Sequence, residues 1–213
     1  MSTSQEPYPT TDTPPPILTL PHNISIRPYH APTDCAPLSL HANNLAVWNN
    51  LRNRMPHPYT PTDSLNWITH ANSTLAPSGP WDSSTASATG PPLPTHYAIC
   101  IADTAVGSIG LDFGSPDDVY ARTAELGYWL GEAHWGQGIM NAAVPAFVAW
   151  AWETFGVLVR INAETDAGNV GSGRVLERAG LRVEGRREKG CVKNGVLRDV
   201  VLWGMVRPGM QGT

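Results

Sequence analysis

Two glycines, Gly136 and Gly138, stand one residue apart between a tryptophan and a segment whose pattern is typical of the start of a helix. Glycine has no side chain to keep a ligand away from the backbone, and the N-terminal end of a helix carries about half a positive charge. Backbone N–H groups at such an end bind anions, most commonly phosphate. The spacing therefore predicts a phosphate-binding turn. A tight turn that needs positive φ remains the alternative on this motif alone.

Two common phosphate-binding motifs do not fit this turn. A Walker A loop has lysine and then serine or threonine directly after its last glycine, and Ile139 and Met140 stand there instead. This excludes a P-loop nucleoside triphosphatase. A Rossmann fingerprint has a third glycine where Asn141 stands, and the strands upstream read as antiparallel. Dinucleotide binding is kept only as a weaker alternative.

The elements that must position this turn follow from apolar periodicity and turn residues. Strands are predicted over 24–29, 95–102, 106–113, 124–130, 157–165, 181–188 and 196–206. Helices are predicted over 37–51 with Asp34 as the cap, from the cap Thr60 through Ile68, from the glycine turn to about Phe155, and over 169–179. Antiparallel strands come first and are followed by strand, helix, strand and helix. This order predicts a protein of the α/β class, in the broad sense that includes α+β folds, with helices covering one mixed sheet.

One domain is predicted over residues 23–207, since 213 residues suffice for a single core. Residues 1–22 are rich in Pro, Thr and Ser and have no Lys or Arg, which predicts a disordered or loosely packed tail. Residues 73–94 are rich in Gly, Pro and Ser and are predicted to form a long loop.

Composition narrows the class of protein. A net charge of −4 without a basic stripe argues against a nucleic-acid partner. No apolar run is long enough for a membrane span, and the amino terminus does not have the layout of a secretory signal. The three cysteines and seven histidines have no metal-ligand spacing, so no metal is expected. Separate cysteines also favour a reducing compartment, and the predicted location is the cytoplasm.

Further motifs accompany the glycine turn. In chain order they are Ile26-Arg-Pro28 with Asp34, Tyr59-Thr60 before Trp67-Ile68, Gly127-Tyr-Trp-Leu130, Trp135-Gly-Gln-Gly-Ile-Met140, Asn169-Val-Gly-Ser172 and Val175-Leu-Glu-Arg-Ala-Gly180. Together they resemble the acetyl-coenzyme A signature of the GNAT N-acetyltransferases, specifically the RimJ/RimL-like branch. The resemblance runs from about Ile24 to Val206.

The cofactor loop departs from the family pattern Arg/Gln-x-x-Gly-x-Gly/Ala at both ends. Trp135 takes its first position, as in many members of this branch, Gly138 keeps the central glycine, and Met140 takes the last position. The resemblance implies the GNAT fold, which is a mostly antiparallel sheet with a central parallel strand pair that splays at the cofactor site, flanked by helices. It also implies a set of residues that bind acetyl-CoA: Trp129, Leu130, Trp135, Gly136, Gln137, Gly138, Ile139, Met140, Asn141, Asn169, Ser172 and Arg174.

The implied reaction is the direct attack of a primary amine on the thioester of acetyl-CoA. It needs a base, donors for the carbonyl oxygen and a group that receives the thiolate. The resemblance assigns the oxyanion donor to a backbone N–H near Leu130 and the thiolate acid to Ser172, for which helix capping is the alternative. Glu125 is the candidate base, with a salt-bridged strand carboxylate as the alternative. Glu164 is expected to face solvent and is next in line as the base, together with bulk water.

The acceptor stays open at this stage. The resemblance places it against the segments 52–59 and 188–195, and it implies a peptide amino terminus, a polyamine or another small amine as the partner. A monomer or a homodimer is expected. A non-catalytic CoA-binding sensor or scaffold module is the alternative from another functional class.

Overall fold

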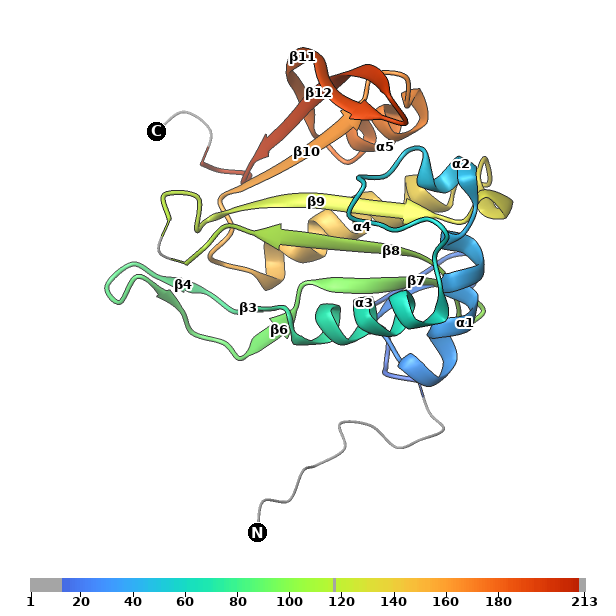
Figure 1. The fold of residues 1–213 in the computed structure, drawn as a ribbon. Helices are drawn as coiled ribbons and strands as arrows, with labels where there is room; N and C mark the ends of the chain where they lie inside the picture. The colour runs from blue at the N-terminus through green and yellow to red at the C-terminus, as the bar shows by residue number, and fades with distance from the viewer. Residues whose placement is uncertain (1–12, 117, 211–213) are drawn as a thin grey trace.

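The computed structural model describes residues 13–116 and 118–210. Within this part of the chain, eight strands form one sheet in the order β1-β2-β7-β8-β9-β10-β12-β11 (Figure 1). Their bounds are β1 Leu18–Leu20, β2 Ile24–Arg27, β7 His96–Ile101, β8 Thr104–Phe113, β9 Thr123–Leu130, β10 Arg160–Asp166, β11 Arg182–Lys193 and β12 Val196–Val206. All neighbouring strands are antiparallel except β9 and β10, which run parallel. The predicted mixed sheet is confirmed.

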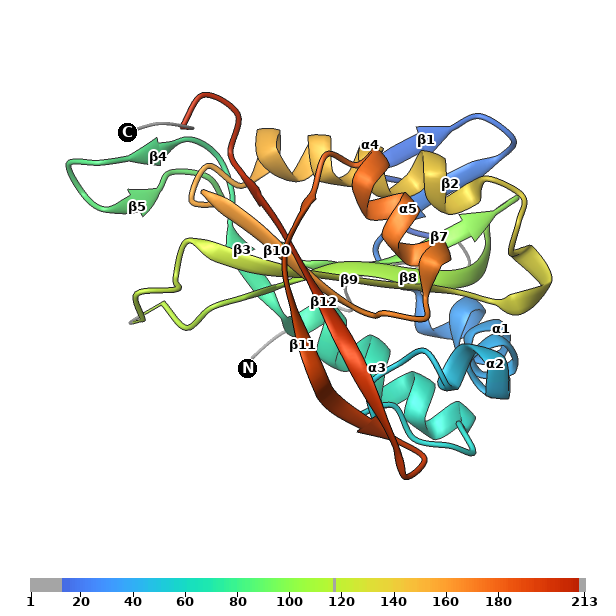
Figure 2. The same ribbon diagram turned by 90° about the horizontal axis from the view of Figure 1, so that it is seen from above.

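Helices cover both faces of this sheet (Figure 2). On one face lie α1 (Ala31–Ala42), α2 (Leu45–Trp48) and α3 (Pro61–Ser73), and on the other lie α4 (Ile139–Thr154) and α5 (Val170–Arg178). The larger apolar core packs under α4 and α5, and a smaller one packs under α1 and α3. No helix in the described residues has the length and apolar character that a membrane crossing requires.

The parallel pairing of β9 with β10 is short. It joins Thr123 to Arg160, Ala124 to Ile161 and Glu125 to Asn162, and it goes no further. Strand β10 continues along β12 to Asp166, while β9 continues along β8 to Leu130. The two strands therefore part after Glu125, as the resemblance implied, and leave a gap in the middle of the sheet.

The helix ends show where local sequence signals sufficed. Helix α3 begins as predicted after Thr60, whose side chain accepts a hydrogen bond from the Asp63 N–H while the Asp63 carboxylate accepts one from the Thr60 N–H. This reciprocal capping box satisfies two N–H groups that the first turn leaves unpaired. Pro61 occupies the tolerated first position.

The prediction of one helix over 37–51 with Asp34 as its cap was wrong. Helix α1 begins at Ala31, so Asp34 lies inside its first turn and points inward. The helix ends at Ala42, because Asn44 starts a new helix by accepting hydrogen bonds from the N–H groups of Ala46 and Val47.

Residues 73–94, predicted as a long loop, contain two short ribbons. Strand β3 (Leu75–Pro77) pairs with β6 (Pro92–Pro94), and β4 (Trp81–Asp82) pairs with β5 (Ser87–Ala88). The Gly79 N–H donates to the Thr154 carbonyl (2.8 Å), and the guanidinium of Arg122 lies 4.2 Å from the Trp81 ring centroid. These contacts attach the segment at the C-terminal end of α4, so it extends away from the glycine turn at the other end of that helix (Figure 1).

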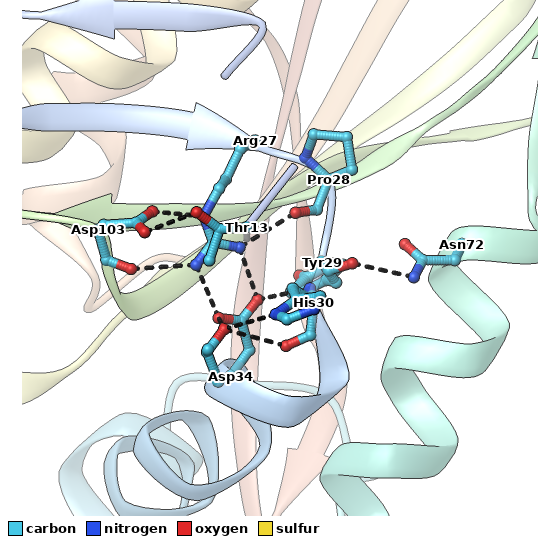
Figure 3. Close-up of polar contacts among 9 residues, drawn as sticks. Thr13, Arg27, Pro28, Tyr29, His30, Asp34, Asn72 and Asp103 are labelled. Carbon is cyan, nitrogen blue, oxygen red and sulfur yellow. Dashed lines mark hydrogen bonds and ion pairs between the residues drawn. The ribbon is translucent and has the colours of Figure 1, made fainter. Parts of the chain in front are cut away.

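A buried ion pair joins β2 to α1 (Figure 3). The guanidinium of Arg27 donates two hydrogen bonds of 2.8 Å to the two carboxylate oxygens of Asp34, and both side chains are almost inaccessible to solvent, at 1% and 0%. Asp34 also accepts the His30 N–H (2.8 Å), and Arg27 Nε donates to Asp103 in the turn between β7 and β8 (2.8 Å). Thr13 donates to the other oxygen of Asp103 (2.7 Å). The cluster fixes the start of α1 against the edge of the sheet.

This geometry predicts unequal effects for the two carboxylates. Asp34→Ala leaves a buried guanidinium without its bidentate partner and should lower the free energy of unfolding by about 3–5 kcal/mol. Asp103→Ala removes a partner whose side chain is 55% exposed, and the loss should be within about 1 kcal/mol. Urea unfolding followed by circular dichroism compares the two variants with the wild type. Equal losses would mean that the buried pair does not hold α1.

Candidate functional site

A cavity of about 990 Å³ opens where β9 and β10 part. Its walls come from the segment between α2 and α3, from β9 and β10, and from the first turns of α4 and α5. All predicted site residues except Gln137 line it: Glu125, Trp129, Leu130, Trp135, Gly136, Gly138, Ile139, Met140, Asn141, Asn169, Ser172 and Arg174. Gln137 is exposed, and its amide donates to the Ala133 carbonyl (2.9 Å) instead.

The glycine turn has the backbone that the sequence suggested. Gly136 and Gly138 have φ values of 72° and 78°, and Gly138 is the N-cap of α4. A Cβ built on either glycine would meet nothing within 4 Å. Positive φ therefore explains the glycines in part. The empty space beside both of them, in front of the unpaired N–H groups of the first turn of α4, is what an anion site also needs.

The strand β9 turns free backbone groups toward the gap. The Gly131 N–H donates to the Val106 carbonyl (2.8 Å), which places this residue pair among the hydrogen-bonded pairs of the antiparallel ladder with β8. Because such pairs alternate, the N–H groups of Tyr128 and Leu130 point the other way, toward the side that β10 has left. The Leu130 carbonyl on that side accepts a hydrogen bond from the Trp135 indole (2.8 Å).

The start of α5 lies next to β9. Asn169 is the N-cap of α5, and its side chain accepts the Ser172 N–H (3.1 Å), so the capping role holds for Asn169. The Ser172 hydroxyl instead donates to the phenol oxygen of Tyr128 (2.8 Å), which in turn donates to the Ser172 carbonyl (3.1 Å). Burial raises the pKa of Tyr128 to about 12, although the bond from Ser172 opposes this, so the phenol stays protonated at neutral pH.

Tyr128 was not predicted as a site residue. Its position inside the motif Gly127-Tyr-Trp-Leu130 could have indicated a role in the site. Side chains alternate along β9, so Tyr128 lies on the opposite face from Glu125 and Trp129. The structure places Tyr128 against the core under α4 and α5, and it places Trp129 against the core under α1 and α3.

Three carboxylates gather at the end of the cavity where the strands are still paired. Glu125 lies directly across from Asp112 on β8, and Glu164 follows on β10 two residues after Asn162, the partner of Glu125. Arg52, from the segment between α2 and α3, donates from one nitrogen atom to both Glu125 and Glu164, at 3.3 Å for Glu164. The expectation that Glu164 faces solvent was thus incomplete: its side chain is 31% exposed and lines the same cavity.

The carboxylates differ in how readily they bind a proton. Partial burial raises the pKa of Glu125, and the neighbouring charges of Glu164 and Asp112 raise it further, while Arg52 lowers it. Asp112 has a pKa lowered to about 2, chiefly by its hydrogen bond from His96 (3.1 Å) and also by Arg54 (3.1 Å). Glu125 is therefore the better proton acceptor of the two. Arg52 and Arg54 belong to the segment 52–59 that the resemblance placed against the acceptor, but neither was singled out, and no sequence signal marked His96.

No group of His, Cys, Asp and Glu side chains in residues 13–116 and 118–210 is arranged to hold a metal ion. The polar groups that face the cavity are backbone N–H groups at one end and ion-paired carboxylates at the other. This arrangement suits a phosphate-bearing ligand together with a cationic one.

Comparison with known proteins identifies the family. The model of the acetyltransferase (GNAT) domain matches residues 23–182, which is most of the chain. The chain belongs to the GNAT acetyltransferase family. The predicted family and fold are thereby confirmed.

Relatives of this GNAT chain include two curated bacterial proteins. It is 41% identical over 87 residues to the "Probable N-acetyltransferase YjcK" of Bacillus subtilis (strain 168), and the match covers 41% of this chain and 48% of that protein. It is 34% identical over 85 residues to the ribosomal-protein-serine acetyltransferase of Escherichia coli (strain K12), with 40% and 47% covered. The chain thus spans about half the length of the curated relatives it matches.

Solved GNAT structures share the fold over most of the chain. The structure of RimL, a ribosomal L7/L12 alpha-N-protein acetyltransferase in complex with coenzyme A, has a TM-score of 0.66 at 17% identity and covers 86% of this chain and 94% of that one. RimJ of Mycobacterium smegmatis, in complex with CoA-disulfide, has a TM-score of 0.64 at 19% identity, with 89% and 85% covered. At 17% and 19% identity, these neighbours show the fold.

The glycine turn of this GNAT domain permits a test against a matched control. Gly138 and Gly195 have nearly the same positive φ, 78° and 76°, and a Cβ on either would meet nothing within 4 Å. Alanine at either position should lower the free energy of unfolding by about 1–2 kcal/mol through backbone strain. Only Gly138→Ala should weaken acetyl-CoA binding, by about tenfold or more, since its Cβ occupies the space before the N–H groups.

Isothermal titration calorimetry with acetyl-CoA and urea unfolding of both variants measure the two effects separately. If both variants bind acetyl-CoA as the wild type does, the turn at Gly138 does not hold the phosphates.

Proposed function

We propose that this chain transfers an acetyl group from acetyl-CoA directly to a primary amine, and that residues 23–207 form the catalytic domain. The observation that carries the proposal is the convergence of three features on one cavity. These are the glycine turn at the start of α4, the free N–H groups of β9 in the gap, and a carboxylate of raised pKa at Glu125. Each is needed for a different part of the reaction.

The phosphate end of acetyl-CoA fits the first turns of α4 and α5. The N–H groups of Ile139, Met140 and Asn141 follow the N-cap Gly138 and have no partner within their helix. Arg174 on α5 lines the same part of the cavity and is exposed, so it can pair with a further phosphate. The rest of the donor would follow β9 through the gap.

The gap supplies donors for the charge that develops on the thioester oxygen. The N–H groups of Tyr128 and Leu130 point into it, and a preorganised backbone donor is the common means of stabilising an oxyanion. The hydroxyls of Ser172 and Tyr128 lie on the α5 side, and an O–H that turns away from its present hydrogen bond can donate to the departing thiolate. A thiol of pKa near ~8.5 leaves with little further help.

Glu125 takes the proton of the attacking amine. Its raised pKa suits a general base, whereas Asp112, with a pKa of about 2, would bind that proton too weakly. Glu125 lies on the α1–α3 face of β9, so the amine approaches from there. Four residues of the strand separate Glu125 from Leu130, and the proton therefore passes through water.

Two relatives guide the choice of acceptor. One is named a ribosomal-protein-serine acetyltransferase and a neighbouring structure an alpha-N-protein acetyltransferase. Their names support a protein amino terminus as the first acceptor to test, before polyamines and other small amines. The cysteines Cys35, Cys100 and Cys191 are free thiols, which supports a cytoplasmic location.

Ligand binding tests the function first. At 100 times its dissociation constant, acetyl-CoA should raise the free energy of unfolding by about 2.7 kcal/mol and therefore raise the melting temperature. NADH and ATP should leave the melting temperature unchanged. Thiol release should then follow with pentapeptides of free amino terminus or with spermidine, but not with N-acetylated peptides. Stabilisation by NADH instead of acetyl-CoA would contradict the proposal, and acetyl-CoA binding without turnover on any amine would favour a CoA sensor.

The pH dependence tests the base. Activity should fall as the pH drops through the raised pKa of Glu125, because the protonated carboxyl cannot accept a proton. Glu125→Gln should lower kcat/KM by about 10²–10⁴-fold at neutral pH and abolish this acid limb. Glu164→Gln removes a neighbouring negative charge and should move the limb to lower pH. A pH–rate profile of the three proteins decides, and an unchanged limb in Glu125→Gln would assign the base elsewhere.

A further inference from the structure

We propose that Glu125 and Glu164 together bind the acceptor as an ammonium ion, and that the guanidinium of Arg52 occupies this position until the acceptor displaces it. The inference rests on the proposed function and deepens it, since it identifies the acceptor as a cationic primary amine. It also means that the Arg52 side chain competes with the acceptor for the two carboxylates.

The two carboxylates converge on one point. Glu125 on β9 and Glu164 on β10 stand on the same face of the sheet, just where the strands separate. A single nitrogen atom, Nη2 of Arg52, contacts both of them. Two carboxylates that share one nitrogen cation form the arrangement that an ammonium ion needs, because its three N–H donors diverge from a single atom.

Glu164 is held in place without Arg52. Its other carboxylate oxygen accepts a hydrogen bond of 2.7 Å from Arg187 on β11. Departure of the Arg52 side chain therefore leaves Glu164 oriented toward the cavity. Two carboxylates this close repel one another, so a cation must replace the guanidinium that leaves.

The backbone on either side of Arg52 is fixed, while its side chain is half exposed, at 51%. Lys193 at the end of β11 donates to the Leu51 carbonyl (3.0 Å) and to the Asn53 side chain (3.0 Å), and its ammonium lies 3.4 Å from the Trp48 ring centroid. The hairpin of β11 and β12 thus clamps the residues that flank Arg52. The part that can move is the Arg52 side chain rather than the whole segment.

The local charges support a monocationic acceptor. The carboxylates of Glu125, Glu164 and Asp112 are matched by the guanidinium groups of Arg52, Arg54 and Arg187, three against three. When Arg52 turns away, this group carries one net negative charge beside the cavity. A single ammonium restores the balance, whereas a carboxylate-bearing ligand at the same point would add to the repulsion.

The test measures cation binding without any turnover. Methylammonium and methylguanidinium chloride reproduce the head groups of the acceptor and of Arg52, and tetramethylammonium chloride is the salt control without N–H donors. In Arg52→Ala, the first two salts should raise the melting temperature and the third should not. In the wild type, the dissociation constants of methylammonium and methylguanidinium should be about tenfold larger or more than in Arg52→Ala, because the tethered Arg52 side chain competes for the same carboxylates.

Three further variants locate the site. Arg52→Lys keeps a cation on the carboxylate pair and should respond like the wild type. Arg187→Ala removes the outer partner of Glu164 but leaves Arg52 in place, so it should respond like the wild type as well. The double variant Arg52→Ala with Glu164→Gln should lose the response. No selective response in Arg52→Ala, or an equal response in the wild type, would overturn the inference.

These outcomes are separate from those for the acetyl transfer itself. Acetyl-CoA titration of the same variants reports on the phosphate end of the cavity, which contains none of the substituted residues. If acetyl-CoA binds to none of these variants, the proposed function is wrong. If acetyl-CoA binds and the small cations do not, only the role of the carboxylate pair fails.

Discussion

The site depends on the point where β9 and β10 stop pairing. Three residue pairs hold the parallel strands together, and beyond Glu125 and Asn162 each strand follows a different neighbour. A strand that loses its partner leaves N–H and C=O groups that need another one. The Trp135 indole satisfies the Leu130 carbonyl, and the N–H groups beside it remain directed toward the gap. A ligand with its own acceptors can complete a strand edge of this kind, and the elongated arm of coenzyme A has such acceptors.

Alternation along β9 places the side chains of the proposed site on opposite faces of the strand. Glu125 and Trp129 point toward α1 and α3, whereas Tyr128 points toward α5 and meets Ser172. The proposed base and the hydroxyls proposed to receive the thiolate are therefore on different sides of one strand, and the gap connects the two sides. The amine can be deprotonated on one face while the sulfur leaves on the other, without either group blocking its counterpart. A continuous sheet would keep them apart.

The sequence predicted those features that depend on neighbouring residues. The glycine turn, the cap Thr60 and most of the strands and helices along the chain each follow from local patterns, and the motifs around Leu130 and Asn169 specified the family. The first helix was mispredicted because Asp34 resembles a cap, whereas its side chain is buried against Arg27, 7 residues earlier in the chain. Other contacts are long-range: Arg52 reaches Glu164 across 112 residues of chain, and Tyr128 reaches Ser172 across 44. Rules based on residue spacing do not predict contacts between residues so far apart in the sequence.

The two ends of the cavity carry different groups, and this separation has a consequence for selectivity. The N-terminal ends of α4 and α5 with Arg174 attract an anion, whereas the carboxylates on β8, β9 and β10 are balanced by Arg52, Arg54 and Arg187. A cationic acceptor is thus repelled from the first end, and in the proposed binding the second end gains a net negative charge only when Arg52 turns away. The arginines that neutralise the carboxylates make the free protein tolerate three negative charges in one place. They also mean that the acceptor gains only the difference between its own contacts and those of Arg52. Selectivity for the acceptor then depends on the rest of the cavity, which Trp67, His70 and Tyr59 also line, rather than on charge alone.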